Sequence, residues 1–306
     1  MLGVLTGFSI IAVVIAVGYL AGRFGIVGDN ARQVFSRTAF FVTNPALLFT
    51  VIAASDVREI FSSFVLIALI SAVVVAALYV AASRLFFRRD AAQTSVGAMA
   101  SLYVNANNIG IPVAVYVLGD AAYVAPVILL QMIVFTPISL SILDLSSGGR
   151  VSLVSVLTQP VRNPVIIASI LGVIVAALGI RLPDPVLAPL ELLGGAAVPL
   201  VLMAFGMSLH GMRPFRAGSG RLEIVVATFL KSVVMPVVAY LVARFLFGAT
   251  GPALFAAVVM AALPTAQNVF LFASRYDRGV AVARDVVLLS SVAAIPVLVV
   301  AAALLA

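Results

Sequence analysis

Ten apolar runs divide this chain, and each is of a length that can cross a membrane as a helix. Gly, Pro and charged residues separate these runs, which occupy residues 4–22, 33–54, 60–82, 92–117, 121–144, 164–180, 192–210, 222–247, 251–274 and 281–304. A helix needs about 20 apolar residues to span the hydrocarbon layer of a bilayer. Because 64% of the residues are hydrophobic and only 9% are charged, a soluble globular domain is excluded. The sequence predicts an all-α polytopic membrane protein with ten transmembrane helices.

The runs form two halves of five. Residues 1–144 and 164–306 flank a polar linker at residues 145–163. The halves resemble each other weakly, since Pro45 corresponds to Pro199 and Pro112 corresponds to Pro264. With an odd number of helices in each half, the second copy must cross the membrane in the opposite sense. We therefore predict an inverted repeat of five plus five helices.

The loop charges predict the orientation. Most arginines follow the first, third, fifth, seventh and ninth runs, whereas the opposite side carries Arg58, Arg181 and Arg244. By the positive-inside rule, the arginine-rich side and the linker face the cytoplasm. We expect a multi-pass protein of the cell (cytoplasmic or inner) membrane with both termini outside. The first run lacks the basic segment and cleavage site of a signal peptide, so we interpret it as a retained helix.

Little in the sequence supports catalysis or metal binding. The chain has no cysteine, which excludes thiolate metal sites and thiol catalysis. Its single histidine, His210, is interpreted as a loop residue at the end of a run beside Gly211. Lys231 and Ser232 are the one adjacent pair with a nucleophile and a base, but neighbours in a helix point about 100° apart. We predict no enzyme activity, no cofactor and no metal, and nucleic acid is not an expected partner.

Two runs are interrupted where a membrane helix should be continuous, and both are fourth in their half. Polar residues at mid-bilayer depth persist only where they face protein or a wet cavity, and paired breaks in corresponding places indicate a transport site. Prolines suit the first turn of a resumed helix, whose exposed N–H groups attract anions. The candidate substrate-binding residues at the breaks are Asn105, Asn108, Gly110, Pro112, Pro264, Thr265, Gln267 and Asn268. The alternative is a pair of packed proline kinks whose amides satisfy freed carbonyls.

Lys231 is the one cation predicted near the midplane. It lies roughly 15 Å from the cytoplasmic end of the eighth helix, and a buried lysine should face the interior and have a partner. It could compensate the partial negative charges where the first segments of helices 4 and 9 end, or contact an anionic substrate directly. No Asp or Glu is predicted at the same depth, so the expected site favours an anion over a cation.

Two further polar residues are predicted at depth. Gln131 in the fifth helix has no neighbouring proline to explain it and is a pocket candidate. Asn44 precedes Pro45, so it could line the pocket or bridge the kink that the proline causes.

Several motifs resemble those of one transporter family. They are Asn105-x4-Gly110-x-Pro112, Leu263-Pro-Thr-Ala-Gln-Asn268 followed by Arg275-Tyr276, Asn44-Pro45-Ala46-Leu47-Leu48-Phe49, and Val198-Pro199 with Gly206-Met207-Ser208-Leu209. In this order and spacing, across the whole chain, they resemble the auxin efflux carrier family. That family includes the plant PIN carriers and bacterial malonate-carrier-like permeases.

The resemblance implies a fold like that of bile-acid-sodium symporters and sodium-proton antiporters, in which broken helices 4 and 9 cross. Helices 1, 2, 6 and 7 would form a scaffold domain, and the others a mobile transporter domain. Asn105, Pro112, Pro264 and Gln131 match pocket positions of PIN-like proteins, and Lys231 matches a lysine often seen in bacterial members. The chain lacks the long cytoplasmic loop of plant carriers, so their regulation is not implied.

The expected function is secondary transport of a small organic anion, a mono- or dicarboxylate such as malonate, by elevator-type alternating access. The alternative is a proton- or sodium-coupled exchanger of another small solute, and a non-transporting receptor also stays open. The expected partners are the carboxylate and the lipid bilayer, with a homodimer through the scaffold domain as an open possibility.

Overall fold

Two compact units make up the computed structural model of the chain. Unit 1 comprises Met1–Ser62, Asn107–Ile128 and Gln159–Met212, and unit 2 comprises Ser63–Ala106, Leu129–Thr158 and Arg213–Ala306. The structure describes residues 2–28, 30–54, 57–146, 163–209 and 220–305. His210 lies outside these residues. In the described part, every regular element is a helix, and one isolated antiparallel bridge accompanies them.

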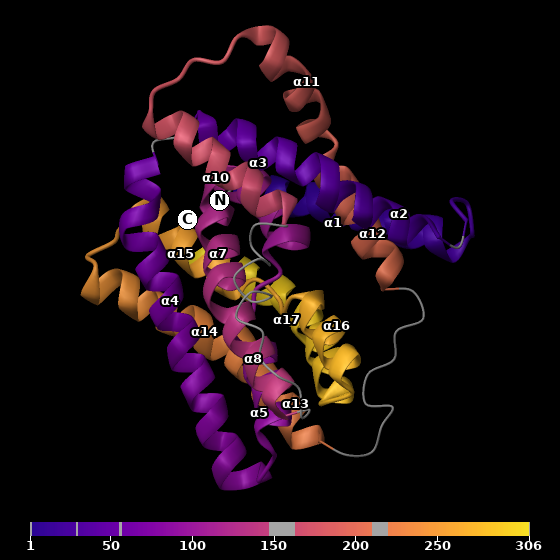
Figure 1. Cartoon of the computed structure of the whole chain (residues 1–306), viewed down its shortest axis with the longest axis vertical. Coiled ribbons are helices and arrows are strands. Elements are labelled where there is room, and N and C mark those ends of the chain that lie inside the picture. Colours follow the sequence, from indigo (N-terminus) through magenta and orange to yellow (C-terminus); the bar gives the residue numbers. More distant parts are fainter. Residues whose placement is uncertain (1, 29, 55–56, 147–162, 210–219, 306) are drawn as a thin grey trace. The chain divides into compact units, whose positions relative to one another are not determined.

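Unit 1 is built on two close helix pairs (Figure 1). Its elements are α1 (Leu2–Arg23), α2 (Ala31–Thr38), η1 (Ala39–Thr43), α3 (Asn44–Ala53), η3 (Ala106–Gly110, from the unit boundary), α6 (Ile111–Val113), η4 (Ala114–Leu118), η5 (Ala121–Tyr123), α7 (Val124–Leu130, ending across the boundary), α10 (Pro164–Ala177), α11 (Asp184–Gly195) and α12 (Ala197–Ser208). Helix α1 packs against α12, and α3 packs against α10. Small residues allow this approach, because a Cβ at Gly206 would lie 2.1 Å from the Ile15 carbonyl oxygen.

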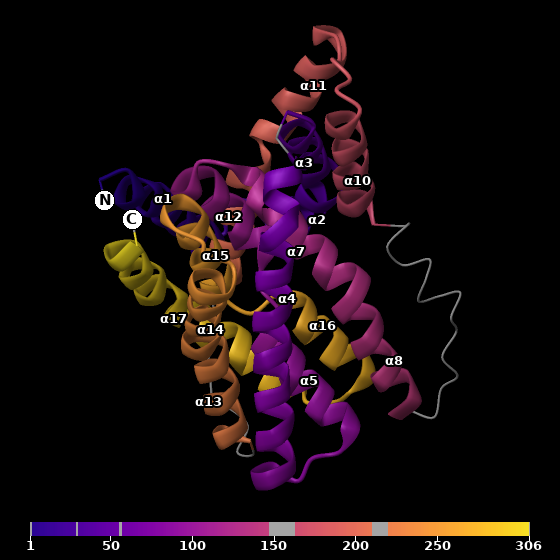
Figure 2. The ribbon, with the colours of Figure 1, turned by 90° about the vertical axis from the view of Figure 1, so that its left-hand side faces the viewer.

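Unit 2 surrounds one short helix. Its elements are α4 (Val57–Ala82, beginning before the boundary), η2 (Ser83–Phe87), α5 (Ala91–Leu102), η6 (Gln131–Phe135), α8 (Thr136–Ser146), α13 (Arg221–Phe229), η8 (Leu230–Val234), α14 (Met235–Leu241), η9 (Val242–Leu246), α15 (Gly251–Ala262), α16 (Gln267–Tyr276) and α17 (Val280–Leu305). Helix α5 contacts α8, α13, α16 and α17. Figure 2 shows α13 and α14 as one continuous rod. The centre of unit 2 is therefore the helix that ends at the first sequence break.

Wide π-helical turns recur just before prolines. The π-helical segments η1, η3, η6 and η8 each end two residues before a proline, at Pro45, Pro112, Pro137 and Pro236, respectively. A proline inside a helix lacks a backbone donor, and its ring clashes with the carbonyl four residues earlier. A π turn widens the helix there and removes the clash, and such turns are frequent at functional sites. Gln131 and Lys231 both lie within these π turns.

The predicted class of a helical, polytopic membrane protein is confirmed. Within the described residues, six helical stretches are long and apolar enough to span a membrane, and four further apolar helices are shorter: 9–23, 106–118, 164–177 and 251–262. Two of the short ones adjoin the breaks that the sequence predicted. The ten-helix count and the five-plus-five repeat stay predictions. The compact units interleave along the chain rather than following the halves 1–144 and 164–306.

Candidate transport site

The two sequence breaks are paired with each other in unit 2. Helix α5 ends at Leu102 and is followed by Tyr103, whose backbone is extended, and α15 ends at Ala262 and is followed by Leu263, which also leaves the helical conformation. Val104 and Thr265 then form an antiparallel bridge, and the Asn105 N–H donates to the Pro264 carbonyl at 2.8 Å. In a membrane, backbone groups freed by a break must find partners inside the protein. Here each break supplies partners for the other.

Thr265 fixes this pairing from the second break. Its hydroxyl donates to the Ala100 carbonyl at 2.6 Å, and its own N–H donates to the Ser290 hydroxyl at 3.0 Å. The side chain is fully buried. The Ala100 carbonyl lies in the last turn of α5, where carbonyl groups have no partner within the helix. Thr265 therefore acts as a cap for α5 and ties it to α17.

Gln131 fixes the pairing from the first break. Its side-chain oxygen accepts the Val104 N–H at 2.8 Å. The Thr136 hydroxyl lies 2.9 Å from the Gln131 carbonyl and 2.6 Å from the Tyr103 hydroxyl. These buried groups connect the π turn of η6 to the extended segment at Tyr103. The Gln131 amide oxygen is thus engaged by the protein backbone.

Lys231 contacts the end of α15. It is 0% exposed, and its ammonium donates to the Ala261 carbonyl at 3.0 Å and lies 3.0 Å from the Met235 sulfur. The carbonyl end of a helix carries partial negative charge. Of the two alternatives for Lys231, charge compensation at a helix end therefore has a direct contact in the structure.

The ion pairs found among the described residues lie elsewhere in unit 2. Glu223, near the start of α13, pairs with Arg89 at 2.6 Å, and Asp285, in the first turns of α17, pairs with Arg284 at 2.7 Å. Arg278 and Asp90 lie 3.9 Å apart at the surface. Both buried acids are thus near helix starts and engaged with arginines. In this part of the chain no carboxylate pairs with Lys231.

Helix α16 resumes with an uncapped N-terminus. Ala266 precedes it and offers no side-chain acceptor for the first-turn N–H groups. Gln267 and Asn268 form this first turn and are half-buried, whereas Pro264 is buried in the pairing segment. An uncapped helix start presents N–H donors and partial positive charge, which suit an anion.

The remaining candidates belong to unit 1. Asn108 and Gly110 lie in the π turn η3, and Pro112 lies in α6. Asn44 begins α3 and is 1% exposed. Its side-chain oxygen and the neighbouring Thr43 hydroxyl have no hydrogen-bond partner among the described residues. A buried acceptor without a partner is costly, which favours a water or ligand at Asn44.

Sequence reasoning missed three side chains that hold the paired breaks together. Tyr103, Thr136 and Ser290 each bond to a break or to Gln131. Each of these residues carries a hydroxyl group inside an apolar run, and that was the signal that the sequence offered. Their relevance could not be recognised because their partners lie far away in the sequence.

Comparisons with known proteins show the class of protein to which this chain belongs. The sequence matches the family described as Membrane transport protein over residues 4–302. A Rhizobium meliloti protein named "Putative malonate transporter" is 28% identical, over 86% of this chain and 83% of that protein. An Escherichia coli protein named "Uncharacterized transporter YfdV" is 26% identical over 87% and 86%, and a Methanocaldococcus jannaschii uncharacterized transporter is 23% identical over 88% of both chains.

The chain is therefore a membrane transporter and not an enzyme. It belongs to the Membrane transport protein family, which is the auxin efflux carrier family that the motifs resembled. Multi-pass insertion in a membrane follows from the family and from the apolar helices.

Proposed function

We propose that the protein is a secondary transporter for a small organic anion. The observation that supports this proposal is the pairing of the two breaks in unit 2. N–H donors at the start of α16 follow the second break, and Lys231 contacts the end of α15 that precedes it. Among the described residues, no carboxylate pairs with Lys231. Preorganised donors beside a buried cation favour a carboxylate over a cation. The name of the Rhizobium meliloti relative is in keeping with a dicarboxylate such as malonate.

The substrate carboxylate rests at the first turn of α16, close to Gln267 and Asn268. Asn105, Pro264 and the π turn of Gln131 shape the same region of unit 2, and Thr265 holds its backbone. Asn108, Gly110, Pro112 and Asn44, which lie in unit 1, are proposed substrate-binding residues of that unit. Lys231 keeps the end of α15 compensated while the anion enters and leaves.

The transport cycle is proposed as elevator-type alternating access, with unit 2 as the mobile domain and unit 1 as the scaffold. The division into two compact units supports this assignment, because unit 1 contains α1, α2, α3, α10, α11 and α12, whereas the bridge between Val104 and Thr265 lies in unit 2. Residues 107–128, which follow the first bridge residue, also belong to unit 1. Ten spanning helices in an inverted repeat, with helices 4 and 9 crossing at the breaks, complete the proposed architecture. We place the protein in the cell (inner) membrane, with both termini outside and a homodimer formed through unit 1.

The site assignment is tested by flux in liposomes. Lys231→Met removes the charge but keeps an unbranched chain, and Asn105→Ala removes an amide at the break. Both variants should lower malonate uptake at least tenfold, because the end of α15 loses its cation or the break loses a polar group. Thr228→Val is the matched control. Thr228 lies in the same continuous helix as Lys231, and its hydroxyl has no hydrogen-bond partner among the described residues. Uptake at the wild-type rate in both test variants would refute this site.

The second candidate is a proton- or sodium-coupled exchanger of another small solute. Carbonyl and amide oxygens at the breaks could hold sodium without a carboxylate. Uptake driven by an imposed sodium or pH gradient, and absent without one, distinguishes this function from uncoupled anion transport.

A further inference from the structure

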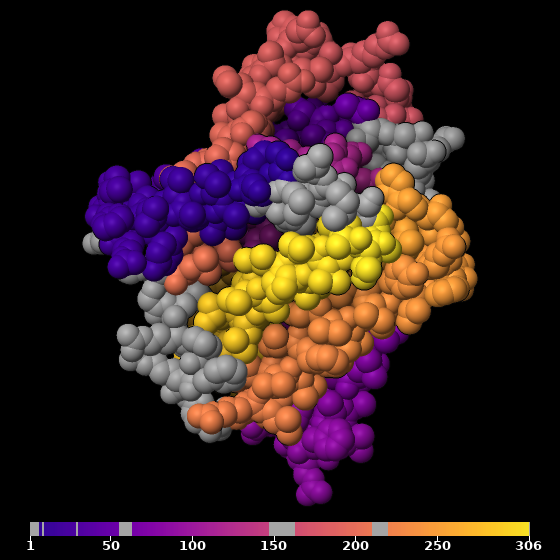
Figure 3. All heavy atoms as spheres, turned by 180° about the vertical axis from the view of Figure 1, so that it is seen from behind, coloured from indigo at the N-terminus to yellow at the C-terminus, as the bar shows by residue number. Residues whose placement is uncertain are grey.

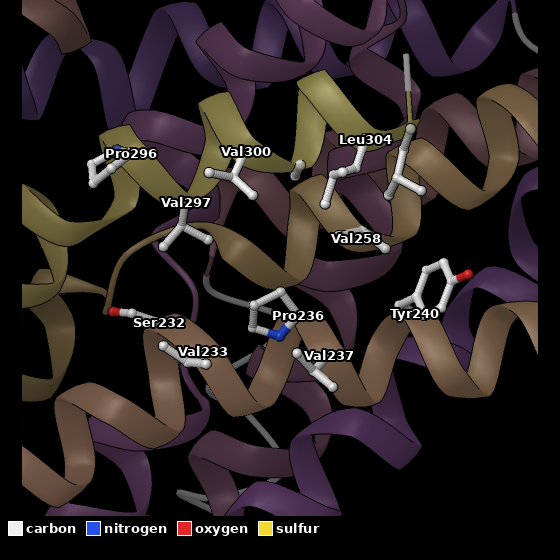
Figure 4. Close-up of a pocket in the computed structure, with 12 residues that line it drawn as sticks. Ser232, Val233, Pro236, Val237, Tyr240, Val258, Pro296, Val297, Val300 and Leu304 are labelled. Atoms are coloured by element: carbon white, nitrogen blue, oxygen red, sulfur yellow. The ribbon is translucent and has the colours of Figure 1, made fainter.

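An apolar groove runs along unit 2 between three of its helices. It has a volume of about 640 Å³ and lies between α14, α15 and α17. Figure 4 shows Pro236 of α14 opposite Val297, Val300 and Leu304 of α17, with Val258 of α15 between the two helices. The only side-chain polar groups in the lining are the hydroxyls of Ser232 and Tyr240. The groove therefore offers almost purely apolar contacts.

The walls of the groove are open to the outside. Val237 is 51% exposed, Val300 is 55% exposed and Leu304 is 76% exposed. In Figure 3 the yellow helix α17 and the orange helices of unit 2 lie side by side at the surface. Pro236 and Pro296 stand in opposite walls. Prolines bend helices, which gives a physical reason for a gap that side chains do not fill.

The length of the groove matches one leaflet of a bilayer. Its lining on α17 extends from Pro296 to Leu305, at the end of that helix. At 1.5 Å per residue this is about 14 Å, and half of the hydrocarbon layer is about 15 Å. An extended hydrocarbon chain from one leaflet fits this length.

The end of the groove carries groups that suit a lipid headgroup. Tyr240 closes the lining on α14, and the exposed Arg244 lies one turn further along the same face of that rod. Tyrosine and arginine are enriched at the membrane–water interface, and arginine there attracts anionic lipids. We propose that the groove binds an acyl chain of an anionic phospholipid, with Tyr240 and Arg244 at its headgroup end.

The chain contains no tryptophan, so one introduced indole reports on the groove alone. Tyr240→Trp places it at the headgroup end. Leu241→Trp is the matched control, because Leu241 is the next residue, is 47% exposed and does not line the groove. Each variant is reconstituted in liposomes with increasing fractions of brominated phosphatidylglycerol or brominated phosphatidylcholine, whose bromines quench indole fluorescence.

In the Tyr240→Trp variant, half-maximal quenching should need about fivefold less phosphatidylglycerol than phosphatidylcholine, as expected for one interfacial arginine. Adding Arg244→Ala should remove that preference, and Leu241→Trp should show none. Val300→Trp is a second reporter in case the first variant does not fold.

Equal quenching of Tyr240→Trp and Leu241→Trp by both lipids would mean ordinary surrounding lipid and would overturn the proposal. Weaker quenching in the groove than at the control would mean that protein, such as a second copy, fills it, and would overturn it as well. The readout does not involve transport, so its failure leaves the proposed transport function unaffected.

Discussion

At the scale of single residues, the paired breaks depend on hydroxyl and amide groups rather than on charges. Thr265 and Gln131 together satisfy two backbone groups that the breaks leave open, the Ala100 carbonyl and the Val104 N–H. Each of these two bonds replaces a backbone partner that a continuous helix would have supplied, and the Tyr103 hydroxyl adds a bond to the Gln131 carbonyl in the π turn η6. Buried neutral side chains thus satisfy the backbone groups that the breaks leave open, whereas Lys231 is the buried cation that contacts the end of α15.

Removing the Thr265 hydroxyl should destabilise the protein. In Thr265→Val the Ala100 carbonyl loses its 2.6 Å partner inside unit 2. A buried group left without a partner costs about 1–3 kcal/mol, so the midpoint of thermal unfolding in detergent should fall. Thr228→Val makes the same chemical change at a hydroxyl without a partner among the described residues and should leave the midpoint unchanged or raise it. Equal midpoints for both variants would show that the Thr265 bond contributes nothing.

At the scale of helices, glycines set how closely the pairs approach. The α1–α12 pair of unit 1 has two such positions, because a Cβ at Gly18 would lie 2.4 Å from the Met203 carbonyl oxygen and one at Gly206 would lie 2.1 Å from that of Ile15. Lipid is as apolar as a leucine side chain, so close packing rather than the hydrophobic effect holds membrane helices together. A methyl group at either glycine must separate the helix backbones.

We therefore expect Gly206→Ala to destabilise unit 1 by about 1–3 kcal/mol, the usual range for overpacking. Thermal unfolding of the purified protein measures this. Gly195→Ala in α11 is the control, since a Cβ there meets nothing within 4 Å, and alanine is the better helix former by about 1 kcal/mol. If Gly206→Ala were as stable as Gly195→Ala, the two helices would not be in the close contact described.

A hydrogen bond between α8 and α16 should make stability depend on alkaline pH. Tyr276 lies beyond the apolar run that ends at residue 274, and its hydroxyl donates to the Asp144 carboxylate at 2.6 Å. Burial, this bond and the charge of Asp144 together raise the pKa of Tyr276 from 10.0 to about 12. A raised folded-state pKa stabilises the protein below pH 10, and that contribution is lost as the pH rises through 12.

Tyr276→Phe should therefore lower the unfolding midpoint at pH 8, through a loss of about 1 kcal/mol or less in the free energy of unfolding, because the bond is only part-buried. The difference from wild type should shrink between pH 10 and 12. Tyr116→Phe, at a phenol that is 39% exposed, controls for the loss of a ring hydroxyl. A difference that stays constant up to pH 12 would contradict the assigned bond.

At the scale of the whole molecule, the residue pattern predicted the class and the breaks, whereas a division into a scaffold and a mobile domain came only from the family resemblance. Hydropathy identifies apolar runs, and polar residues with prolines locate the interruptions, so the helices and the candidates Asn105 and Thr265 could be predicted from the sequence. The π turns at Gln131 and Lys231 could not be predicted, because they arise from steric conflict with prolines in a packed helix. Hydropathy also cannot distinguish a lipid-facing surface from one that packs on protein, so the bounds of the interleaved units and the role of Ser290 required the structure.

Alternating access predicts that the start of α16 becomes accessible from each side of the membrane in turn. The chain has no cysteine, so Gln267→Cys gives a single reporter in the first turn of α16, where the native side chain is half-buried. A membrane-impermeant thiol reagent should label it from either side in oriented vesicles, and saturating malonate should slow labelling from both, because the anion is proposed to occupy the same turn. Thr250→Cys, in the exposed segment before α15, should react only from outside if the termini are outside, and Ser71→Cys, at a fully buried position, should not react. Labelling of Gln267→Cys from one side alone, at a rate that malonate does not change, would mean that α16 does not exchange between the two faces.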